Sequence, residues 1–287
     1  MSSIIMRDKI CIVTGANTGI GKETAIGLAE MGATVVMVCR NRRRGESAAA
    51  DIRRLTDNPA VELMIADLSS QRQVRQLAAD FQIKHSRLDV LVNNAGVITP
   101  RRQRTVDGLE TQFAVNHLAP FLLTNLLLDV LKASAPSRIV VVASQVESRG
   151  KIEFDDLQGE RRYDYMAAYC QSKLANVMFT YELARRLDGT GVTANCLHPG
   201  VIATNLLSDY MKRPRAIGMV NRLRYPGPSE GAQTSIYLAS DPAMEGVSGR
   251  YFRCDTGETP SSKASYDEDA WRRLWEVSEQ LTGMRQQ

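Results

Sequence analysis

The 287-residue sequence predicts one α/β domain built on a doubly wound parallel sheet, with helices on both faces of the sheet. Short apolar runs rich in β-branched residues alternate with stretches of helical periodicity, which is typical of strand–helix–strand units. The runs are too apolar for one sheet face to meet water, so a parallel sheet covered on both sides is expected. Right-handed crossovers then favour the doubly wound arrangement. Because no repeat, low-complexity tract or interdomain linker interrupts the alternation, residues 1–287 are expected to form a single domain.

The expected strands are bounded by turn residues, and the segments between them contain good helix formers. The six expected strands are 9–15 (KICIVTG), 34–40 (TVVMVCR), 61–67 (VELMIAD), 88–96 (LDVLVNNAG), 138–144 (RIVVVAS) and 192–200 (VTANCLHPG). The five expected helices are 21–32, 43–55, 70–82, 109–134 and 165–187.

Two segments, 145–164 and 202–228, follow strand ends without forming a regular element. Ligands of open α/β sheets bind beyond the carboxyl ends of the strands, so both are candidate substrate walls and the second is a candidate lid. Near the C-terminus, residues 266–282 predict an amphipathic helix with Trp271 and Trp275 on its apolar side. This helix is expected to cover the lid, the core or a neighbouring subunit.

Composition excludes several classes of protein. A hydrophobic content of 44% and a charged content of 24% are typical of a globular chain, and a net charge of +4 is too mild to indicate a nucleic-acid partner. The longest apolar run, residues 121–131, is too short for a transmembrane segment. The N-terminus runs directly into the first strand, so no anchor is expected and a cytoplasmic protein is predicted. The scattered cysteines and histidines show neither a disulfide framework nor a metal-binding spacing.

A glycine-rich turn follows the first expected strand, in the stretch TGANTGIGKETA. Gly15, Gly19 and Gly21 would let the chain turn tightly and let a diphosphate approach backbone N–H groups at a helix N-terminus. The spacing is G-x3-G-x-G, not the commoner G-x-G-x-x-G, and a purely architectural turn is the alternative. The position after the first strand favours a dinucleotide site in a Rossmann-type fold.

The second expected strand ends in arginines. Arg40 and Asn41 are followed by three further arginines, with no carboxylate before Glu46. A carboxylate would repel a 2′-phosphate, whereas a guanidinium can bind it with two hydrogen bonds. The stretch therefore predicts NADP(H) over NAD(H), with Arg40 as the main contact. The alternative is that residues 42–44 merely begin a solvated helix, and for Arg43 this alternative is expected.

Taken together, several motifs resemble those of the short-chain dehydrogenase/reductase family. The motifs are TGANTGIG, NNAG at 93–96, Asn116, Ser144, YCQSK at 169–173 and HPG at 198–200, in the family's order over residues 8 to about 255. FDDLQGE, SEGAQTSIYLAS and SGRYF look like the retinol dehydrogenase branch. That branch interconverts lipophilic aldehydes and alcohols with NADP(H), which would be the function here.

The resemblance implies four catalytic residues. Tyr169 would exchange a proton with the substrate oxygen, and Lys173 would lower the pKa of that phenol and bind the nicotinamide ribose. Ser144 would hydrogen-bond the carbonyl oxygen, and Asn116 would maintain a water-linked proton path to Lys173. Each has a structural alternative: a snorkelling lysine beside a core tyrosine, a serine that ends a strand, and an asparagine that kinks a helix.

Further cofactor contacts are implied by the same resemblance. They are Asn17, Thr18 and Ile20 in the phosphate-binding turn, Asp67 and Leu68 at the adenine, Asn94, Ala95 and Gly96 at the adenosine ribose, and Pro199, Gly200, Val201, Ile202 and Thr204 at the nicotinamide. Asp67 has an alternative role as a helix cap.

The expected partner is a small lipophilic carbonyl compound or alcohol, because the predicted lid carries an apolar, methionine-containing wall. Its basic residues would permit weak peripheral association with an anionic membrane surface, the alternative being a solvated lid. The resemblance also implies that copies associate through the two long helices containing Asn116 and Tyr169. Two other functions stay open: a non-catalytic NADP-binding sensor and a light-dependent tetrapyrrole reductase.

Overall fold

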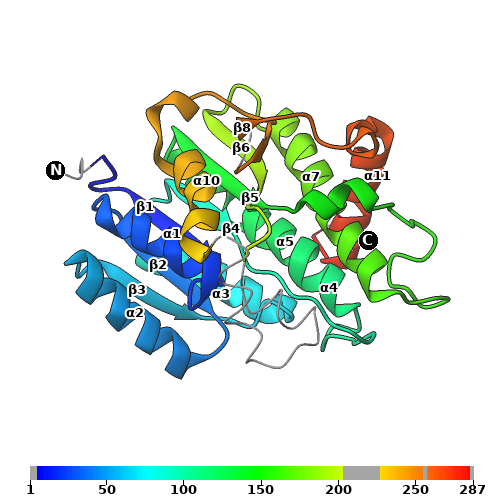
Figure 1. Ribbon diagram of the computed structural model, residues 1–287, viewed down its shortest axis with the longest axis horizontal. Helices are drawn as coiled ribbons and strands as arrows, with labels where there is room; N and C mark the ends of the chain where they lie inside the picture. The colour runs from blue at the N-terminus through cyan, green and yellow to red at the C-terminus, as the bar shows by residue number, and fades with distance from the viewer. Residues whose placement is uncertain (1–4, 203–226, 255–256, 285–287) are drawn as a thin grey trace.

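A computed structural model of the chain describes residues 5–202, 227–254 and 257–284. One eight-stranded sheet runs through it in the order β3-β2-β1-β4-β5-β6-β7-β8, with β1 to β7 parallel and β8 antiparallel (Figure 1). Strand order reverses beside β1, which is the mark of a doubly wound sheet. The predicted fold class is confirmed.

All six expected strands are present, and two short ones follow them. The strands are β1 (Ile10–Thr14), β2 (Thr34–Cys39), β3 (Val61–Ile65), β4 (Val90–Asn93), β5 (Ser137–Val142), β6 (Val192–His198), β7 (Tyr251–Arg253) and β8 (Gly257–Glu258). The sequence did not predict β7 and β8 because they are too short to show a two-residue period.

The helices of the nucleotide-binding half match the predicted ones closely. They are α1 (Gly19–Glu30), α2 (Arg42–Thr56) and α3 (Gln71–Lys84). The others are α4 (Thr111–Phe113), the π-turn η1 (Ala114–Leu118), α5 (Ala119–Leu126), α6 (Leu128–Ala133), η2 (Gln145–Arg149), α7 (Tyr165–Arg186), α10 (Pro228–Ser240), η4 (Pro242–Met244), η5 (Lys263–Tyr266) and α11 (Glu268–Leu281).

The prediction of one continuous helix over residues 109–134 was wrong. The segment is divided into α4, η1, α5 and α6. Pro120 has no N–H to donate to the carbonyl of Asn116, so the regular helical register is lost at that turn. A π-turn inside a helix is often found at a functional site.

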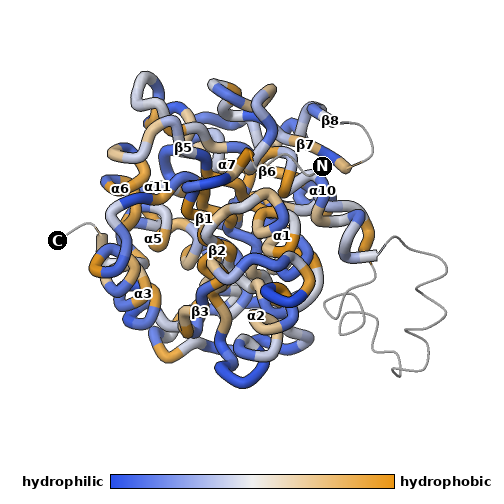
Figure 2. The backbone as a smooth tube through the Cα atoms, turned by 90° about the vertical axis from the view of Figure 1, so that its left-hand side faces the viewer, coloured by the Kyte–Doolittle hydropathy of each residue, from blue (hydrophilic) through white to orange (hydrophobic). Residues whose placement is uncertain are grey.

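Successive residues of each central strand face opposite layers. Val35 and Met37 of β2 pack in one core with residues of α1, α2 and α10, whereas Val36 and Val38 pack in the other with residues of α3, α5 and α7. The strands therefore form much of the hydrophobic interior, as the hydropathy colouring in Figure 2 shows. This double burial explains why the strands are apolar throughout.

The C-terminal helix α11 packs against α7 and α5. Trp275 contacts the rings of Phe121 and Phe179, with centroids 4.9 Å and 5.9 Å away. Of the three places considered for this helix, the described residues therefore show it on the core. The predicted lid, with its basic residues, lies outside the described residues apart from Ile202, Gly227 and Pro228. None of the helices in the described ranges is long and apolar enough to cross a membrane.

Candidate active site

The candidate site residues gather where parallel strands end. The glycine turn follows β1, the NNAG turn follows β4, Ser144 follows β5, and Pro199 follows β6. In a parallel sheet the carboxyl ends of the strands lie at one edge. The strand order reverses between β1 and β4, where such sheets bind ligands. The fold thus brings together segments that are more than a hundred residues apart.

The glycine turn is held tightly against the NNAG turn. Gly15 and Gly19 adopt φ values of 68° and 59°, which favour glycine. A Cβ at Gly21 would lie 2.4 Å from Asn94 Nδ2 and 2.6 Å from the Gly15 carbonyl oxygen. The third glycine is therefore required by backbone packing.

Thr14 joins these two turns, although the sequence analysis did not single it out. Its hydroxyl oxygen accepts hydrogen bonds from the backbone N–H of Asn94 (2.9 Å) and Ala95 (3.0 Å). Asn94 Nδ2 donates to the Thr14 carbonyl at 2.8 Å. The side chain of Asn94 is thus used to fix the turn.

The N-terminus of α1 differs from those of α2, α3 and α7. Thr18 occupies its N-cap position in an extended conformation, but its side chain accepts no hydrogen bond from the helix. In α2, α3 and α7, by contrast, Asn41, Ser70 and Asp164 accept one each. The first N–H groups of α1 are therefore free of a side-chain cap, as anion binding requires.

Arg40 extends from the end of β2 into solvent. Its side chain is 76% exposed, and Nη1 lies 3.9 Å from Asp67 Oδ2 at the end of β3. Asp67 also accepts hydrogen bonds from the N–H and hydroxyl of Ser69. The alternative role of Asp67 as a helix cap was wrong, because Ser70 caps α3. The Oδ1 atom of Asn41 caps α2, and the partly buried Leu68 packs against the core.

Tyr169 and Lys173 are buried on one face of α7. They are 7% and 3% exposed, and Lys173 Nζ donates a hydrogen bond to the Val142 carbonyl at 2.8 Å. Nζ lies 5.8 Å from the centroid of the Tyr169 ring. The lysine does not snorkel to solvent, so the structural alternative for this pair is wrong.

The pKa values of the pair differ from the expectation. Burial raises the pKa of Tyr169 above its ordinary value, although a hydrogen bond with Ser144 opposes the shift. Burial also lowers the pKa of Lys173 to about 8. The expectation that Lys173 lowers the phenol pKa is therefore not met by these residues alone, because burial of the phenol disfavours the phenolate.

Ser144 begins the short helix η2 and faces Tyr169. Its hydroxyl oxygen accepts a hydrogen bond from the Val146 N–H at 3.4 Å, and its side chain lies near enough to the Tyr169 hydroxyl to oppose the rise of the phenol pKa. The two oxygen atoms predicted to contact a substrate carbonyl are therefore neighbours.

Asn116 lies at the centre of the π-turn and is fully buried. Its Oδ1 accepts from the Val97 N–H at 2.8 Å, and its Nδ2 donates to the Val97 carbonyl at 3.0 Å. Nδ2 also donates to Ser172 Oγ at 3.0 Å, and Ser172 donates to the Tyr169 carbonyl. Asn116 is thus bonded to backbone, as its structural alternative predicts, while also touching the catalytic helix.

Gly96 lies between Asn116 and Lys173. A Cβ at Gly96 would lie 3.5 Å from Asn116 Oδ1 and 3.6 Å from Lys173 Nζ. The absence of a side chain at residue 96 leaves both polar atoms facing the same small space.

The segment after β6 borders the other side of the site. Gly200 has a φ of 91°, and a Cβ there would lie 2.8 Å from Cys254 Sγ. Ile202 and Ile20 converge on Gly231 of α10, whereas Val201 is 50% exposed. Thr204 lies outside the described residues.

Comparisons with known proteins agree with this geometry. A family profile described as short chain dehydrogenase matches residues 9–214. The chain belongs to the short-chain dehydrogenase/reductase family. Human retinol dehydrogenase 14 is 47% identical over 98% of this chain and 88% of its own length. Human retinol dehydrogenase 13 is 47% identical over 96% of this chain and 85% of its own length.

Solved structures show the same fold. An uncharacterised protein from Mycobacterium Paratuberculosis superposes with a TM-score of 0.80 at 35% identity, covering 97% of this chain and 94% of that one. A short chain dehydrogenase from Shigella flexneri, solved in complex with NADP, has a TM-score of 0.73 at 25% identity and covers 88% and 99% of the two chains. As a member of this family, the protein is an oxidoreductase that acts on alcohol and carbonyl groups with NAD(P).

Proposed function

We propose that the protein is an NADP(H)-dependent oxidoreductase that interconverts a lipophilic aldehyde or ketone and its alcohol. The observation that carries the proposal is the buried group of Tyr169, Ser144 and Lys173 at the edge of a dinucleotide-binding sheet. A phenol hydrogen-bonded to a serine hydroxyl can give a proton to a carbonyl oxygen that the serine also holds.

The residues present fit a dinucleotide. Gly15 and Gly19 supply a turn that other residues rarely adopt, and α1 offers backbone N–H groups with no side-chain cap. A diphosphate is the ligand that such a helix terminus favours. We place the diphosphate of the dinucleotide at the N-terminus of α1.

The preference for NADP(H) rests on Arg40. Its guanidinium is exposed at the end of β2 and only loosely paired with Asp67, so it is available to a 2′-phosphate at little cost. The relative from Shigella flexneri was solved with NADP, which supports the choice.

NADP(H), when bound, supplies or accepts the hydride. In the direction of reduction Tyr169 gives its proton to the carbonyl oxygen, and its raised pKa keeps it in the required protonated form at neutral pH. Ser144 donates a hydrogen bond to the same oxygen and stabilises the charge that develops there.

Lys173 would hold the nicotinamide ribose, and we assign it the role of supplying the proton that restores the Tyr169 hydroxyl. A lysine whose pKa lies near 8 can release and regain a proton close to neutral pH. Asn116 fixes the Val97 backbone beside Lys173, and we assign it the role of ordering the water that links the lysine to solvent.

The apolar substrate class is supported by relatives whose names are retinol dehydrogenases. The test follows NADPH and NADH oxidation in the dark with retinal, decanal and a steroid ketone. Oxidation of NADPH in preference to NADH with at least one of these carbonyls is expected. Cofactor binding without turnover would instead indicate a sensor, and turnover of a tetrapyrrole only under light would indicate a photoreductase.

A further inference from the structure

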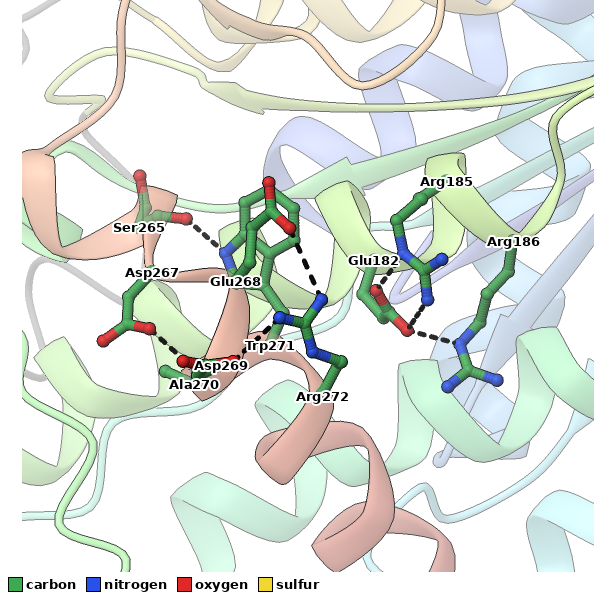
Figure 3. Close-up of polar contacts among 10 residues, drawn as sticks. All are labelled: Glu182, Arg185, Arg186, Ser265, Asp267, Glu268, Asp269, Ala270, Trp271 and Arg272. Carbon is green, nitrogen blue, oxygen red and sulfur yellow. Dashed lines mark hydrogen bonds and ion pairs between the residues drawn. The ribbon is translucent and has the colours of Figure 1, made fainter.

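Residues 261–282, here named the C-terminal strap, cross the outer side of the catalytic helix α7. Figure 3 shows the start of α11 beside the C-terminal end of α7, with the Trp271 indole directed at Ser265 and Asp267 capping the helix. The Tyr181 hydroxyl of α7 lies 2.6 Å from Ser261 Oγ. The strap is therefore attached to α7 by polar contacts as well as by ring packing.

One strap residue binds a buried carboxylate. Glu147 is 3% exposed, and its two oxygen atoms accept hydrogen bonds from the Ser262 N–H (2.9 Å) and hydroxyl (2.6 Å). A buried charge is costly unless it is hydrogen-bonded, so the two hydrogen bonds from Ser262 hold the Glu147 carboxylate in its position.

Glu147 belongs to the same turn as Ser144. Its backbone N–H donates to the Ser144 carbonyl at 3.0 Å, and its carbonyl accepts from Gly150 at 2.8 Å. A shift of Glu147 would therefore move the backbone that carries the Ser144 hydroxyl.

A second strap residue binds the turn that carries Asn116. His117 is fully buried, and its Nε2 lies 2.9 Å from Ser278 Oγ. Because the Ser278 hydroxyl already donates to the Leu274 carbonyl at 2.7 Å, the imidazole is the donor and carries its proton on Nε2.

Apart from Ser278 and the Asn176 side chain, the described surroundings of the imidazole are apolar. The ring is surrounded by those of Phe113, Phe121 and Phe179, with centroids 5.0 to 6.4 Å away. Burial lowers the pKa of His117 to about 3, although the Asn176 side chain opposes the shift, so the ring is neutral at neutral pH. Ser278 thus fixes the residue next to Asn116 in the π-turn.

We propose that the C-terminal strap is a positioning device for the reaction, holding Ser144 through the Glu147–Ser262 contact and Asn116 through the His117–Ser278 contact. Glu147 and His117 are its positioning residues; neither touches the reacting atoms. The kinetic part of the proposal rests on the proposed carbonyl reduction, whereas the structural part does not.

The test uses the full chain with Ser262→Ala and Ser278→Ala. Hydrogen–deuterium exchange of the amides in 145–150 should be about tenfold faster in Ser262→Ala, and that of 114–118 about tenfold faster in Ser278→Ala. With NADPH and the carbonyl substrate, kcat and kcat/KM should fall together by about tenfold, while the dissociation constant of NADPH stays unchanged. Ser262→Thr, which restores the hydroxyl, should recover the rate.

Two controls separate positioning from stability. Asp269→Ala removes an exposed partner of Arg272 on the outer face of the strap and should change neither measurement (Figure 3). Phe81→Leu weakens the hydrophobic core at the end of α3 without removing a contact of Ser262 or Ser278, and it should lower the melting temperature without the loss of kcat.

Unchanged exchange in both turns, or a fall in kcat no larger than that of Phe81→Leu, would overturn the strap proposal. Hydrogen–deuterium exchange does not require turnover, so it tests the structural role of the strap even if the protein reduces none of the carbonyls. Absence of turnover in the unmodified protein would count against the proposed function instead.

Discussion

The helices α1 and α7 both contribute to the candidate site, but with different parts. α1 presents its N-terminus, where glycines bring the backbone close and no side chain caps the first turn. α7 has a capped N-terminus, because Asp164 accepts a hydrogen bond from the Ala167 N–H, and it presents Tyr169 and Lys173 from its side. α1 thus offers backbone groups and α7 offers side chains. Substitutions in α1 are therefore expected to change cofactor affinity, and substitutions of Tyr169 in α7 to change proton transfer.

The largest effect is expected from Tyr169→Phe. The ring still fills its buried place, but the hydroxyl beside Ser144 is lost. Steady-state kinetics should show kcat reduced about a thousandfold, and fluorescence titration should show unchanged NADPH binding. Tyr165→Phe, one turn earlier on α7, is the matched control and should keep the wild-type rate. A Tyr169→Phe enzyme with a tenth of normal turnover would exclude the phenol as proton donor.

The second effect is expected at the terminus of α1. Gly21→Ala places a methyl group against Asn94 and the Gly15 carbonyl, so the dissociation constant of NADPH should rise about a hundredfold, as for two lost hydrogen bonds to a charged group. Gly27→Ala makes the same change in the same helix, but its Cβ meets only the end of the Ile236 side chain, 2.4 Å away. Calorimetry should show weaker binding for Gly21→Ala alone, and equal losses in the two variants would contradict the proposed phosphate site.

The third effect sharpens the cofactor assignment. Arg40→Asp should raise the KM for NADPH about tenfold and leave that for NADH unchanged or lower, because a guanidinium contact is exchanged for a repulsive charge. Thermal unfolding should barely change, since the Arg40 side chain is 76% exposed. Arg43→Asp, on the exposed first turn of α2, should preserve the preference. An unaltered ratio of the two KM values in Arg40→Asp would refute Arg40 as the phosphate contact.

The smallest effect concerns the pH dependence of stability. Lys173 loses its proton near pH 8 in the folded protein but near its ordinary pKa when unfolded, so above pH 8 the unfolded chain binds more protons. The penalty of burying the ammonium is thus fully present below pH 8 and declines as pH rises. Relative to Lys173→Met, the unfolding free energy should increase by about 1 kcal/mol between pH 8 and pH 9. Denaturant titrations of both proteins provide the measurement, and a flat or falling difference would show that the lysine keeps its ordinary pKa.

Much of the fold was predictable because local patterns determine it. The six central strands are apolar on both faces, and β2 shows why: alternate residues enter different cores. The glycine turn was predictable for the same reason, since the requirement for φ above zero or for a missing Cβ is visible in the sequence itself.

Features that depend on distant residues were not predictable. The contacts of Asn116 with Val97 and Ser172 and the role of Thr14 both depend on segments that are distant in sequence. The pKa of Tyr169 depends on how deeply α7 is buried, which no four-residue spacing reveals. Glu147 and His117 are ordinary polar residues in sequence and acquire partners only when the last thirty residues fold back.

The position of α11 also bears on how copies of this chain could meet. Trp275 lies against Phe121 of α5 and Phe179 of α7, and the Arg186 guanidinium lies over its indole at 4.1 Å. α11 therefore covers apolar side chains of the two long helices through which copies were expected to associate. A partner that docked on these side chains would first have to displace α11, and exposing Trp275 would forfeit about 3 kcal/mol or more of packing.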